Sequence, residues 1–333
     1  MARDKGAYST RRNFCWTLAG VLVAPSIAIA QASKVRRIGI LEPGEGGGPP
    51  RFRRRLAEPL EKLGWVEGQN LLVEQRYANG RPEALQSLAE ELVRAKVEII
   101  VTAGTPATLA AKRATSTIPI VFRTAGDPVL LGLVASLARP GGNVTGYSIA
   151  GPEVTAKYLT VLKELLPSVQ RIGVLWWGGN PYTRATRGQF EHVCQSLGLV
   201  PIIVEVGAAD EPDGVIAQLV RQRVQALVLS DISWDYDKVE EAVGVATKHR
   251  LPTISDDWET ARHGALIAYS STLAEQFQRR AEYIDRILRG AKPADLPVQQ
   301  ATKFELVINL KTAKALGLTI PKELLLRADE VIQ

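Results

Sequence analysis

The segment around residue 104 combines residue types that suit binding of a small anion. Gly104, Thr105 and Pro106 follow an apolar run at 97–102. Thr105 is predicted to cap a helix that begins at Pro106. Gly104 would let a ligand approach the backbone, and the free N–H groups of a helix start attract a carboxylate. Capping alone also explains these residues, so both interpretations stay open.

A second such segment follows the apolar run at 118–123. Asp127 and Pro128 repeat the arrangement with an acidic cap. Here too, simple capping is the alternative to ligand binding. Tyr147, on the short apolar run at 144–148, is a further candidate ligand contact.

Tryptophans accompany polar residues at three places in the second half of the chain. The candidates are Trp176, Trp177, Asn180, Asp231, Asp257 and Trp258. Each place follows an apolar run, as does Trp234. An aromatic wall suits an aromatic or apolar ligand, and a carboxylate would hold an amino group. The alternative is that the tryptophans pack the core, where large aromatic side chains are mostly buried.

Signatures of catalysis are weak. Residues 44–49 (GEGGGP) begin like a dinucleotide fingerprint, but Pro49 stands where the last glycine is required. The chain has neither a phosphate-binding GxxxxGK[ST] loop nor a GxSxG nucleophile elbow. Its three histidines, His192, His249 and His263, are scattered, and no Cys/His spacing typical of a metal site exists. We therefore predict a protein without catalytic residues, metal or cofactor.

The elements that must position these residues alternate between strands and helices. Apolar, β-branched runs at 35–41, 71–77, 97–102 and 118–123 are predicted strands, and the segments 82–95 and 106–115 have helical patterns. This alternation is typical of a parallel sheet covered by helices on both faces. Ligands of such sheets bind beyond the carboxyl ends of the strands.

The same plan then returns further along the chain. Four landmarks recur with a nearly constant shift: RIGIL at 37 and RIGVL at 171, LG at 63 and 197, LVR at 92 and 219, and a residue pair ending in proline at 118 and 251. Such a shift indicates an internal duplication. We predict an α/β fold of two Rossmann-like lobes with parallel sheets.

Three crossings between the lobes are expected, near 144–148, 264–270 and 293–300. Lobe 1 would comprise 33–148 plus about 270–292, and lobe 2 would comprise 151–267 plus about 298–333. Residues 302–305 (TKFE) look like a capping box that opens a final helix over 304–316. Several crossings make a hinge that permits closure around a ligand.

The N-terminal segment 1–30 has the order of an export signal. A basic segment containing Arg11 and Arg12 precedes the uncharged stretch 14–24, and Ala28-Ile29-Ala30 offers small residues to a peptidase. We predict a signal peptide over 1–30, cleavage after Ala30 and a periplasmic protein. The paired arginines also resemble a twin-arginine signal. An uncleaved anchor is the alternative, but the stretch is shorter than the roughly 20 residues that a spanning helix needs.

Composition agrees with an ordinary globular protein. Of the 333 residues, 46% are hydrophobic and 23% are charged. Half of the net charge of +6 lies within the segment 1–30, so the remainder is too weakly basic for a nucleic-acid binder. Of the two cysteines, Cys15 and Cys194, only Cys194 would survive cleavage, which excludes an internal disulfide.

Several motifs together resemble one family. Residues 63–71 (LGWVEGQNL) are similar to the LGW/YVEGQNL motif of ABC transporter substrate-binding proteins, the family that includes tryptophan/tyrosine-type binding proteins. The other matching segments are 102–107 (TAGTPA), 116–121 (STIPIV), 127–128, 133–146 (LVASLARPGGNVTG) and 304–321 (FELVINLKTAKALGLTIP). The resemblance covers nearly all of the chain after Ala30. Residues 176–181 (WWGGNP) depart from the family's usual WNPxNP.

The resemblance implies a periplasmic-binding-protein type 1 fold with a three-crossing hinge and no catalysis. It implies an aromatic or hydrophobic amino acid, or a related acid, as ligand, and it places Gly104, Thr105, Asp127 and Pro128 in the cleft. The expected partners are a small molecule and the permease subunits of an ABC importer, with no nucleic acid, no membrane contact except through the permease, and a monomeric state. The alternatives are a two-lobed ligand sensor without a transport role and a secreted hydrolase.

Overall fold

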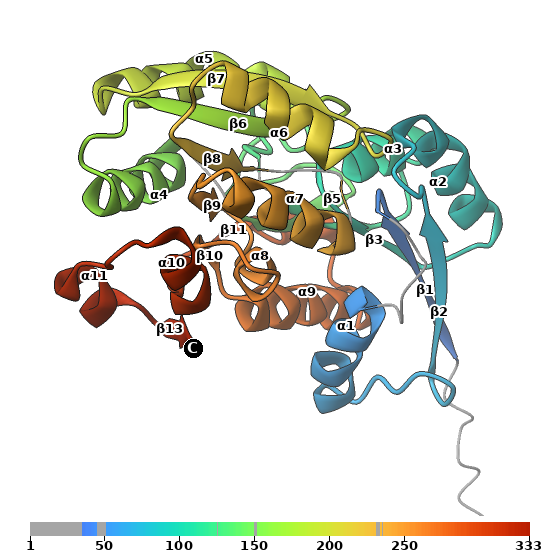
Figure 1. The fold of residues 1–333 in the computed structure, drawn as a ribbon. Coiled ribbons are helices and arrows are strands. Elements are labelled where there is room, and N and C mark those ends of the chain that lie inside the picture. The colour runs from blue at the N-terminus through green and yellow to red at the C-terminus, as the bar shows by residue number, and fades with distance from the viewer. Residues whose placement is uncertain (1–34, 45–50, 125, 150–151, 231–233, 235) are drawn as a thin grey trace, which may run out of the picture. The chain divides into compact units, whose positions relative to one another are not determined.

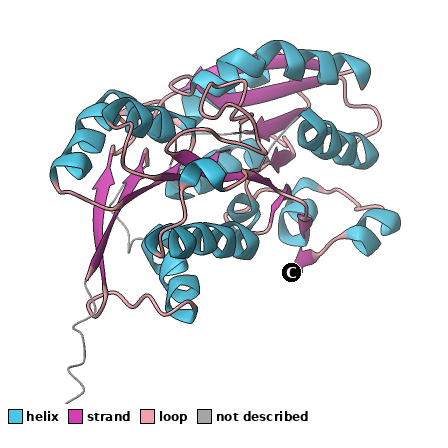
Figure 2. Ribbon diagram, turned by 180° about the vertical axis from the view of Figure 1, so that it is seen from behind, coloured by secondary structure: helices cyan, strands magenta, loops and turns pink. Residues whose placement is uncertain are grey.

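The computed structural model describes residues 35–44, 51–124, 126–149, 152–230, 234 and 236–333. The predicted signal peptide lies outside these residues. The part of the chain from Val35 to Gln333 is one compact unit that contains two sheets, each flanked by helices (Figures 1 and 2).

The first sheet has six strands in the order β11-β5-β4-β3-β1-β2, all parallel. These strands are β1 (Arg36–Glu42), β2 (Leu71–Tyr77), β3 (Ile99–Ala103), β4 (Ile120–Thr124), β5 (Val144–Ser148) and β11 (Gln299–Gln300). The helical elements associated with it are α1 (Arg51–Lys62), η1 (Pro82–Ala84), α2 (Leu85–Arg94), α3 (Thr105–Ala114), α9 (Leu273–Leu288) and η2 (Pro293–Asp295).

The second sheet has seven strands in the order β13-β12-β10-β9-β8-β6-β7. These are β6 (Arg171–Trp177), β7 (Val200–Val206), β8 (Ala226–Leu229), β9 (Thr253–Ser255), β10 (Ile267–Ser271), β12 (Phe304–Asn309) and β13 (Glu330–Ile332). The helices are α4 (Pro152–Leu165), α5 (Pro181–Ser196), α6 (Pro212–Arg221), α7 (Tyr236–Lys248), α8 (Trp258–Arg262), α10 (Leu310–Leu316) and α11 (Lys322–Arg327). All strand pairs are parallel except β10 with β12, which is antiparallel.

The duplication predicted from the landmarks is visible in the order of the strands. Five strands of the first sheet run β2-β1-β3-β4-β5, and five of the second run β7-β6-β8-β9-β10. The packing repeats as well. A Cβ on Gly39 would lie 2.9 Å from Leu92 Cδ2, and a Cβ on Gly173 would lie 2.9 Å from Leu219 Cδ1. A glycine in the first strand of each unit therefore gives the same close approach to a helix.

Each sheet has a hydrophobic core on both faces. In the first sheet, α1 and α9 pack on the face that carries Ile38 and Ile40, and α2 and α3 pack on the opposite face. In the second sheet, α4 and α5 cover the face of Ile172, and α6 and α7 cover the face of Leu175. Strands that are buried on both faces are continuous apolar runs in the sequence, which is why these runs predict the positions of the strands. The predicted α/β fold class is confirmed.

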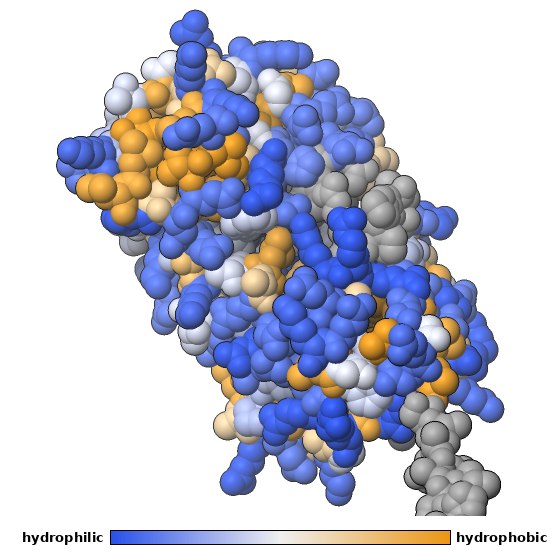
Figure 3. Space-filling view, turned by 90° about the horizontal axis from the view of Figure 1, so that it is seen from below, coloured by the Kyte–Doolittle hydropathy of each residue, from blue (hydrophilic) through white to orange (hydrophobic). Residues whose placement is uncertain are grey.

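The outer surface is mainly polar. Figure 3 shows one face of the molecule, where hydrophilic side chains predominate and hydrophobic ones gather in a patch at one end. Among the described residues, Leu326 of α11 is the most exposed large hydrophobic side chain, at 77%. A single exposed leucine of this kind is normal on a globular protein.

The chain passes between the sheets three times: after Ser148, after Ser271 and after Gln300. The helix α9 follows β10 of the second sheet and packs against α1, β4 and β5 of the first. Figure 1 shows this route, with α9 beside α1.

The predicted final helix over 304–316 is wrong in its first half. Residues Phe304–Asn309 form β12, which pairs with β10 through the register Ile267↔Ile308. The helix begins only at Leu310, where Asn309 Oδ1 accepts a hydrogen bond from the N–H of Thr312 at 3.1 Å. The expected capping box at 302–305 therefore does not form, because the buried Val307 and Ile308 contribute more as strand residues in the core.

Candidate functional site

The carboxyl edges of the two sheets meet through residues that follow their strands. Arg55 of α1 forms an ion pair with Glu259 of α8, with 2.8 Å between Nη2 and Oε1. Gly126, after β4, lies against the ring of Tyr182, after β6, because a Cβ on this glycine would be 2.6 Å from Tyr182 Cδ2.

A third contact also joins residues that follow strands of the two sheets. A Cβ on Gly80, after β2, would collide with the Cβ of Ala208, which follows β7. All these contacts join loops or helices that come after the carboxyl ends of parallel strands. That edge is where open parallel sheets bind ligands.

Gly104 begins α3 on the first sheet. Its φ of 78° requires glycine, and Gly104, not Thr105, is the N-cap of the helix. The predicted cap at Thr105 is therefore wrong. Thr105 is already helical, and its buried hydroxyl lies 2.7 Å from the hydroxyl of Thr124, while Pro106 follows it inside the first turn. The β-branched Thr105 gains more from this buried hydrogen bond than from capping.

Asp127 is exposed and Pro128 is buried. Asp127 Oδ1 accepts hydrogen bonds from the N–H groups of Val129 at 2.8 Å and Leu130 at 3.1 Å. The carboxylate thus caps a turn, as predicted for an acidic cap, although this turn does not continue as an α-helix. Capping explains the Asp127 side chain as the structure has it, and its role in ligand binding stays a prediction.

Tyr147 lies on β5 at the first crossing, and its side chain is fully buried. No described residue meets its hydroxyl group in hydrogen-bonding geometry. Burial, followed by the nearby Glu275 carboxylate, raises the pKa of Tyr147 above its ordinary value. The hydroxyl is therefore a neutral group near the crossings.

The two tryptophans of β6 have different surroundings. Trp176 packs edge-on against Phe190 of α5, with 4.9 Å between the ring centroids, inside the core on the α4–α5 face. This residue has the packing role that the sequence left open. Trp177 is the last residue of the strand, and its ring lies against Gly179. Consecutive strand residues point to opposite faces, so the two buried rings pack separately, and that of Trp177 supports the loop that follows β6.

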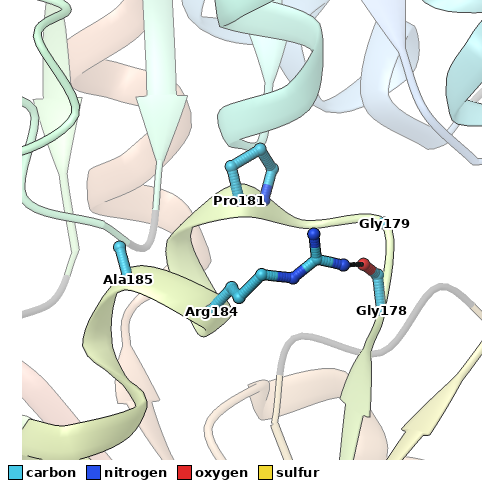
Figure 4. Close-up of a pocket in the computed structure, with 5 residues that line it drawn as sticks. All are labelled: Gly178, Gly179, Pro181, Arg184 and Ala185. Atoms are coloured by element: carbon cyan, nitrogen blue, oxygen red, sulfur yellow. Dashed lines mark hydrogen bonds between the residues drawn. The ribbon is translucent and has the colours of Figure 1, made fainter.

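That loop borders an open pocket of about 530 Å³, lined by Gly178, Gly179, Pro181, Arg184 and Ala185. Figure 4 shows the side chain of Arg184 reaching back across the loop, where Nη2 donates to the carbonyl oxygen of Gly178 at 3.0 Å. Asn180, buried between these residues, caps α5 by accepting from the N–H of Tyr182 at 2.9 Å.

The loop after β9 holds Asp257 and Trp258. Asp257 Oδ1 caps α8 by accepting from the N–H of Glu259 at 3.0 Å. The Arg262 guanidinium stacks on the Trp258 ring at 4.1 Å, a cation–π contact. Asp231 lies outside the described residues. Trp234 is buried and donates from Nε1 to the carbonyl oxygen of Gly207 at 2.9 Å, so it is a core residue.

A polar cluster on the first sheet escaped the sequence analysis. Glu42 and Tyr77 end β1 and β2 and are register partners, and Arg123 near the end of β4 donates to Gln276 Oε1 at 2.8 Å. The buried Arg280 of α9 donates from Nε to the Gln276 carbonyl oxygen at 3.1 Å. A polar residue at the end of an apolar strand was the signal that could have predicted this cluster. Glu42 was missed because it lies one residue beyond the predicted strand.

Burial raises the pKa of Glu42 to about 7, against the opposing charges of Arg280 and Arg123. Burial, followed by the charge of Glu42, raises the pKa of Tyr77 to about 12. Loss of hydration disfavours the charged form of both groups. The cluster therefore holds a carboxyl group whose pKa lies near neutral pH and a phenol that keeps its proton.

The described part of the chain contains no group of three His, Cys, Asp or Glu side chains that could hold a metal ion. Within the same residues, every helix is too short or too polar to cross a bilayer.

Two parallel sheets of the same strand order, joined by three crossings and meeting at their carboxyl edges, define a periplasmic-binding-protein type 1 fold. Comparisons with known proteins agree. The family model described as "ABC transporter substrate binding protein" matches residues 37–332. This chain belongs to that family, whose members act outside the cytoplasm, bind small molecules and serve ABC transporters.

Individual relatives span most of the chain. A tyrosine-binding protein of Clostridioides difficile (strain R20291) is 25% identical over 293 residues, which are 86% of this chain and 82% of the relative. A conserved domain protein from Vibrio cholerae has a TM-score of 0.81 at 27% identity, covering 90% of this chain and 100% of the other. An ABC domain from Streptococcus pneumonia, solved in complex with L-Trp, has a TM-score of 0.79 at 24% identity, covering 89% and 99%.

Proposed function

We propose that this chain is the periplasmic solute-binding component of an ABC importer and that it binds an aromatic amino acid between the carboxyl edges of its two sheets. The observation that carries the proposal is the meeting of these edges through Arg55 with Glu259 and Gly126 with Tyr182. A solute held there would contact both units, so binding would favour their closure.

Two further observations support an aromatic solute. One relative is named a tyrosine-binding protein, and a protein of the same fold was solved with L-Trp. Trp177 ends β6, and its buried ring packs against Gly179, which lines the open pocket, so an aromatic side chain supports the pocket loop from beneath. The contacts we propose are Gly104, Thr105, Pro106, Asp127, Pro128, Tyr147, Trp177, Asn180, Asp231, Asp257 and Trp258. We leave Trp176 out because Phe190 packs against it in the core.

The other parts of the proposal follow from the same role. The protein would be a monomer without catalytic activity, exported by its N-terminal segment 1–30, and would dock on permease subunits after loading. Its two lobes would be the residues 33–148 plus about 270–292, and 151–267 plus about 298–333. The three crossings between the sheets would serve as the hinge.

Calorimetric titration with the common amino acids tests the proposal. L-Tyr or L-Trp is expected to bind, and Trp177→Ala is expected to weaken that binding at least tenfold because the pocket loop at Gly179 loses the ring that it packs against. Trp65→Phe is the matched control, since Trp65 donates to Asp285 at 2.8 Å, away from the carboxyl edges. Binding of a sugar or another non-aromatic solute in place of aromatic amino acids would contradict the proposed solute.

A further inference from the structure

Glu42 and Tyr77 stand side by side at the carboxyl edge of the first sheet. They are the last residues of neighbouring parallel strands and are paired in register. Strands in a sheet are about 4.8 Å apart, so the two side chains are adjacent. Both lie on the face that carries Ile38 and Ile40, because side chains alternate along a strand. Gly80, which contacts Ala208, follows the same carboxyl edge of the first sheet.

The polar atoms of this pair are buried but not paired. Among the described residues, none forms a hydrogen bond with Glu42 Oε1 or with the Tyr77 hydroxyl, although both atoms are shielded from solvent. A buried acceptor without a donor costs roughly 1–3 kcal/mol, and more when it is charged. Such atoms are rare in native structures and call for a specific explanation.

The two arginines whose charges act on Glu42 each donate a hydrogen bond from Nε to Gln276. Arg123 donates from Nε to the Gln276 side chain, and Arg280 donates from Nε to the Gln276 carbonyl oxygen. Arg53, which faces Tyr77 from α1, forms an ion pair with Glu67. These groups set the charge around the pair: Arg280 and Arg123 face Glu42, and Arg53 faces Tyr77.

We propose that Glu42 and Tyr77 bind the ammonium group of the solute, so that the protein takes amino acids and rejects the corresponding acids without an amino group. An ammonium has three donors and no acceptor, which suits a carboxylate oxygen next to a hydroxyl oxygen. The solute carboxylate would lie toward Arg123 and Arg280, whose charges attract it. This inference rests on the proposed function and narrows its class of solute.

The proposal includes a dependence on pH. A cationic ligand binds the ionised form of Glu42, and the pKa of this group in the free protein is about 7. Protonation therefore competes with the ligand below that pH, and the affinity is expected to fall about 30-fold between pH 8 and pH 5.5. The ammonium and the carboxylate of an amino acid keep their charges over this range.

The test compares L-Tyr with 3-(4-hydroxyphenyl)propanoate, which lacks only the amino group, and L-Trp with indole-3-propanoate. Calorimetric titrations are made at pH 8 and pH 5.5 on the full chain and on Glu42→Gln, Tyr77→Phe and the control Glu58→Gln, an exposed residue of α1 paired with Lys62. We expect the amino acids to bind at least 30-fold more tightly than the acids. Glu42→Gln should lose most of that difference and its pH dependence, Tyr77→Phe should lose about fivefold, and Glu58→Gln should lose nothing.

Two results would overturn the proposal while leaving the proposed function intact. One is binding of the amino acids by Glu42→Gln with parental affinity, and the other is equal affinity for the amino acids and the acids. If neither kind of aromatic compound binds the unmodified protein, the proposed function fails and this inference falls with it. Thermal unfolding of each variant separates a loss of binding from a loss of fold.

Discussion

The guanidinium group of Arg55 lies 2.8 Å from the carboxylate of Glu259, and this ion pair joins a helix of the first sheet to a helix of the second. The side chain of Glu259 is 8% exposed and that of Arg55 is 31% exposed, so the pair is largely shielded from water. An ion pair of this kind helps to hold the two helices together only while both partners are present.

Arg55→Ala is expected to weaken solute binding by about 5- to 30-fold, or roughly 1–2 kcal/mol, because closure then buries the Glu259 carboxylate without the charge of Arg55. Calorimetric titration with the best aromatic amino acid measures the effect. Lys62→Ala removes a fully exposed ion pair with Glu58 on the same helix and should leave the affinity unchanged. An Arg55→Ala protein that binds as tightly as the control would show that the pair does not contribute to closure.

Glu42 is expected to make the stability of the ligand-free protein depend on pH. Its pKa in the folded state is about 7, above the ordinary value of 4.5, so the folded protein binds more protons than the unfolded chain between these values. Its contribution to stability is thus fully present below about pH 4.5 and is lost as the pH rises through 7. Glu42→Gln should raise the free energy of unfolding by roughly 1–3 kcal/mol at pH 8.5 and by almost nothing at pH 4.5.

Urea unfolding of both proteins at the two pH values checks this expectation. Equal stability of Glu42→Gln and the unmodified protein at pH 8.5 would mean that the carboxylate is hydrated and is not shielded as the structure has it. The same variant is expected to gain stability and lose affinity, which no general damage to the fold can produce.

Gly146 in β5 is expected to tolerate no side chain. Its φ is 154°, and a Cβ at this position would collide with the backbone oxygen of Phe122 on the neighbouring strand β4. Backbone cannot move aside as a side chain can, so Gly146→Ala should lower the free energy of unfolding by about 3 kcal/mol or more. Gly142→Ala, where nothing lies within 4 Å of an added Cβ, should change it by less than about 0.5 kcal/mol.

Thermal and urea unfolding of these two glycine variants make the comparison. Similar stabilities would show that β4 and β5 can separate locally. Because β5 leads directly into the first crossing between the sheets, Gly146→Ala should also weaken solute binding.

Cys194 should be inert in the folded protein. Its side chain is buried in the α4–α5 core, and burial, followed by the charge of Glu191, raises the pKa of the thiol to about 12. The thiolate is the reactive form, so iodoacetamide at pH 8 should leave a Cys15→Ser protein unmodified over hours and alkylate it once in urea. Mass spectrometry measures how many alkyl groups each protein molecule carries. Rapid alkylation without denaturant would show that this core opens readily.

The sequence alone was sufficient for the fold class, because buried parallel strands are continuous apolar runs and the duplication repeats them at a nearly constant offset. The pairing of Gly39 with Leu92 and of Gly173 with Leu219 gives that repeat a physical reason, since each helix can approach its strand only where a side chain is missing. The family motifs were local as well, and the match over residues 37–332 confirms the family.

Only the tertiary structure decided how each strand-end side chain is packed. A single step along β6 separates Trp176, whose ring packs against Phe190, from Trp177, which is equally buried but packs against Gly179 of the following loop. The pair of Glu42 and Tyr77 comes from two different strands, and its buried, unpaired oxygen atoms depend on what α1 and α9 place over them. The pattern of apolar residues in the sequence indicates which positions belong to the core. Burial and hydrogen bonding of an individual side chain depend on tertiary neighbours that the sequence pattern does not specify.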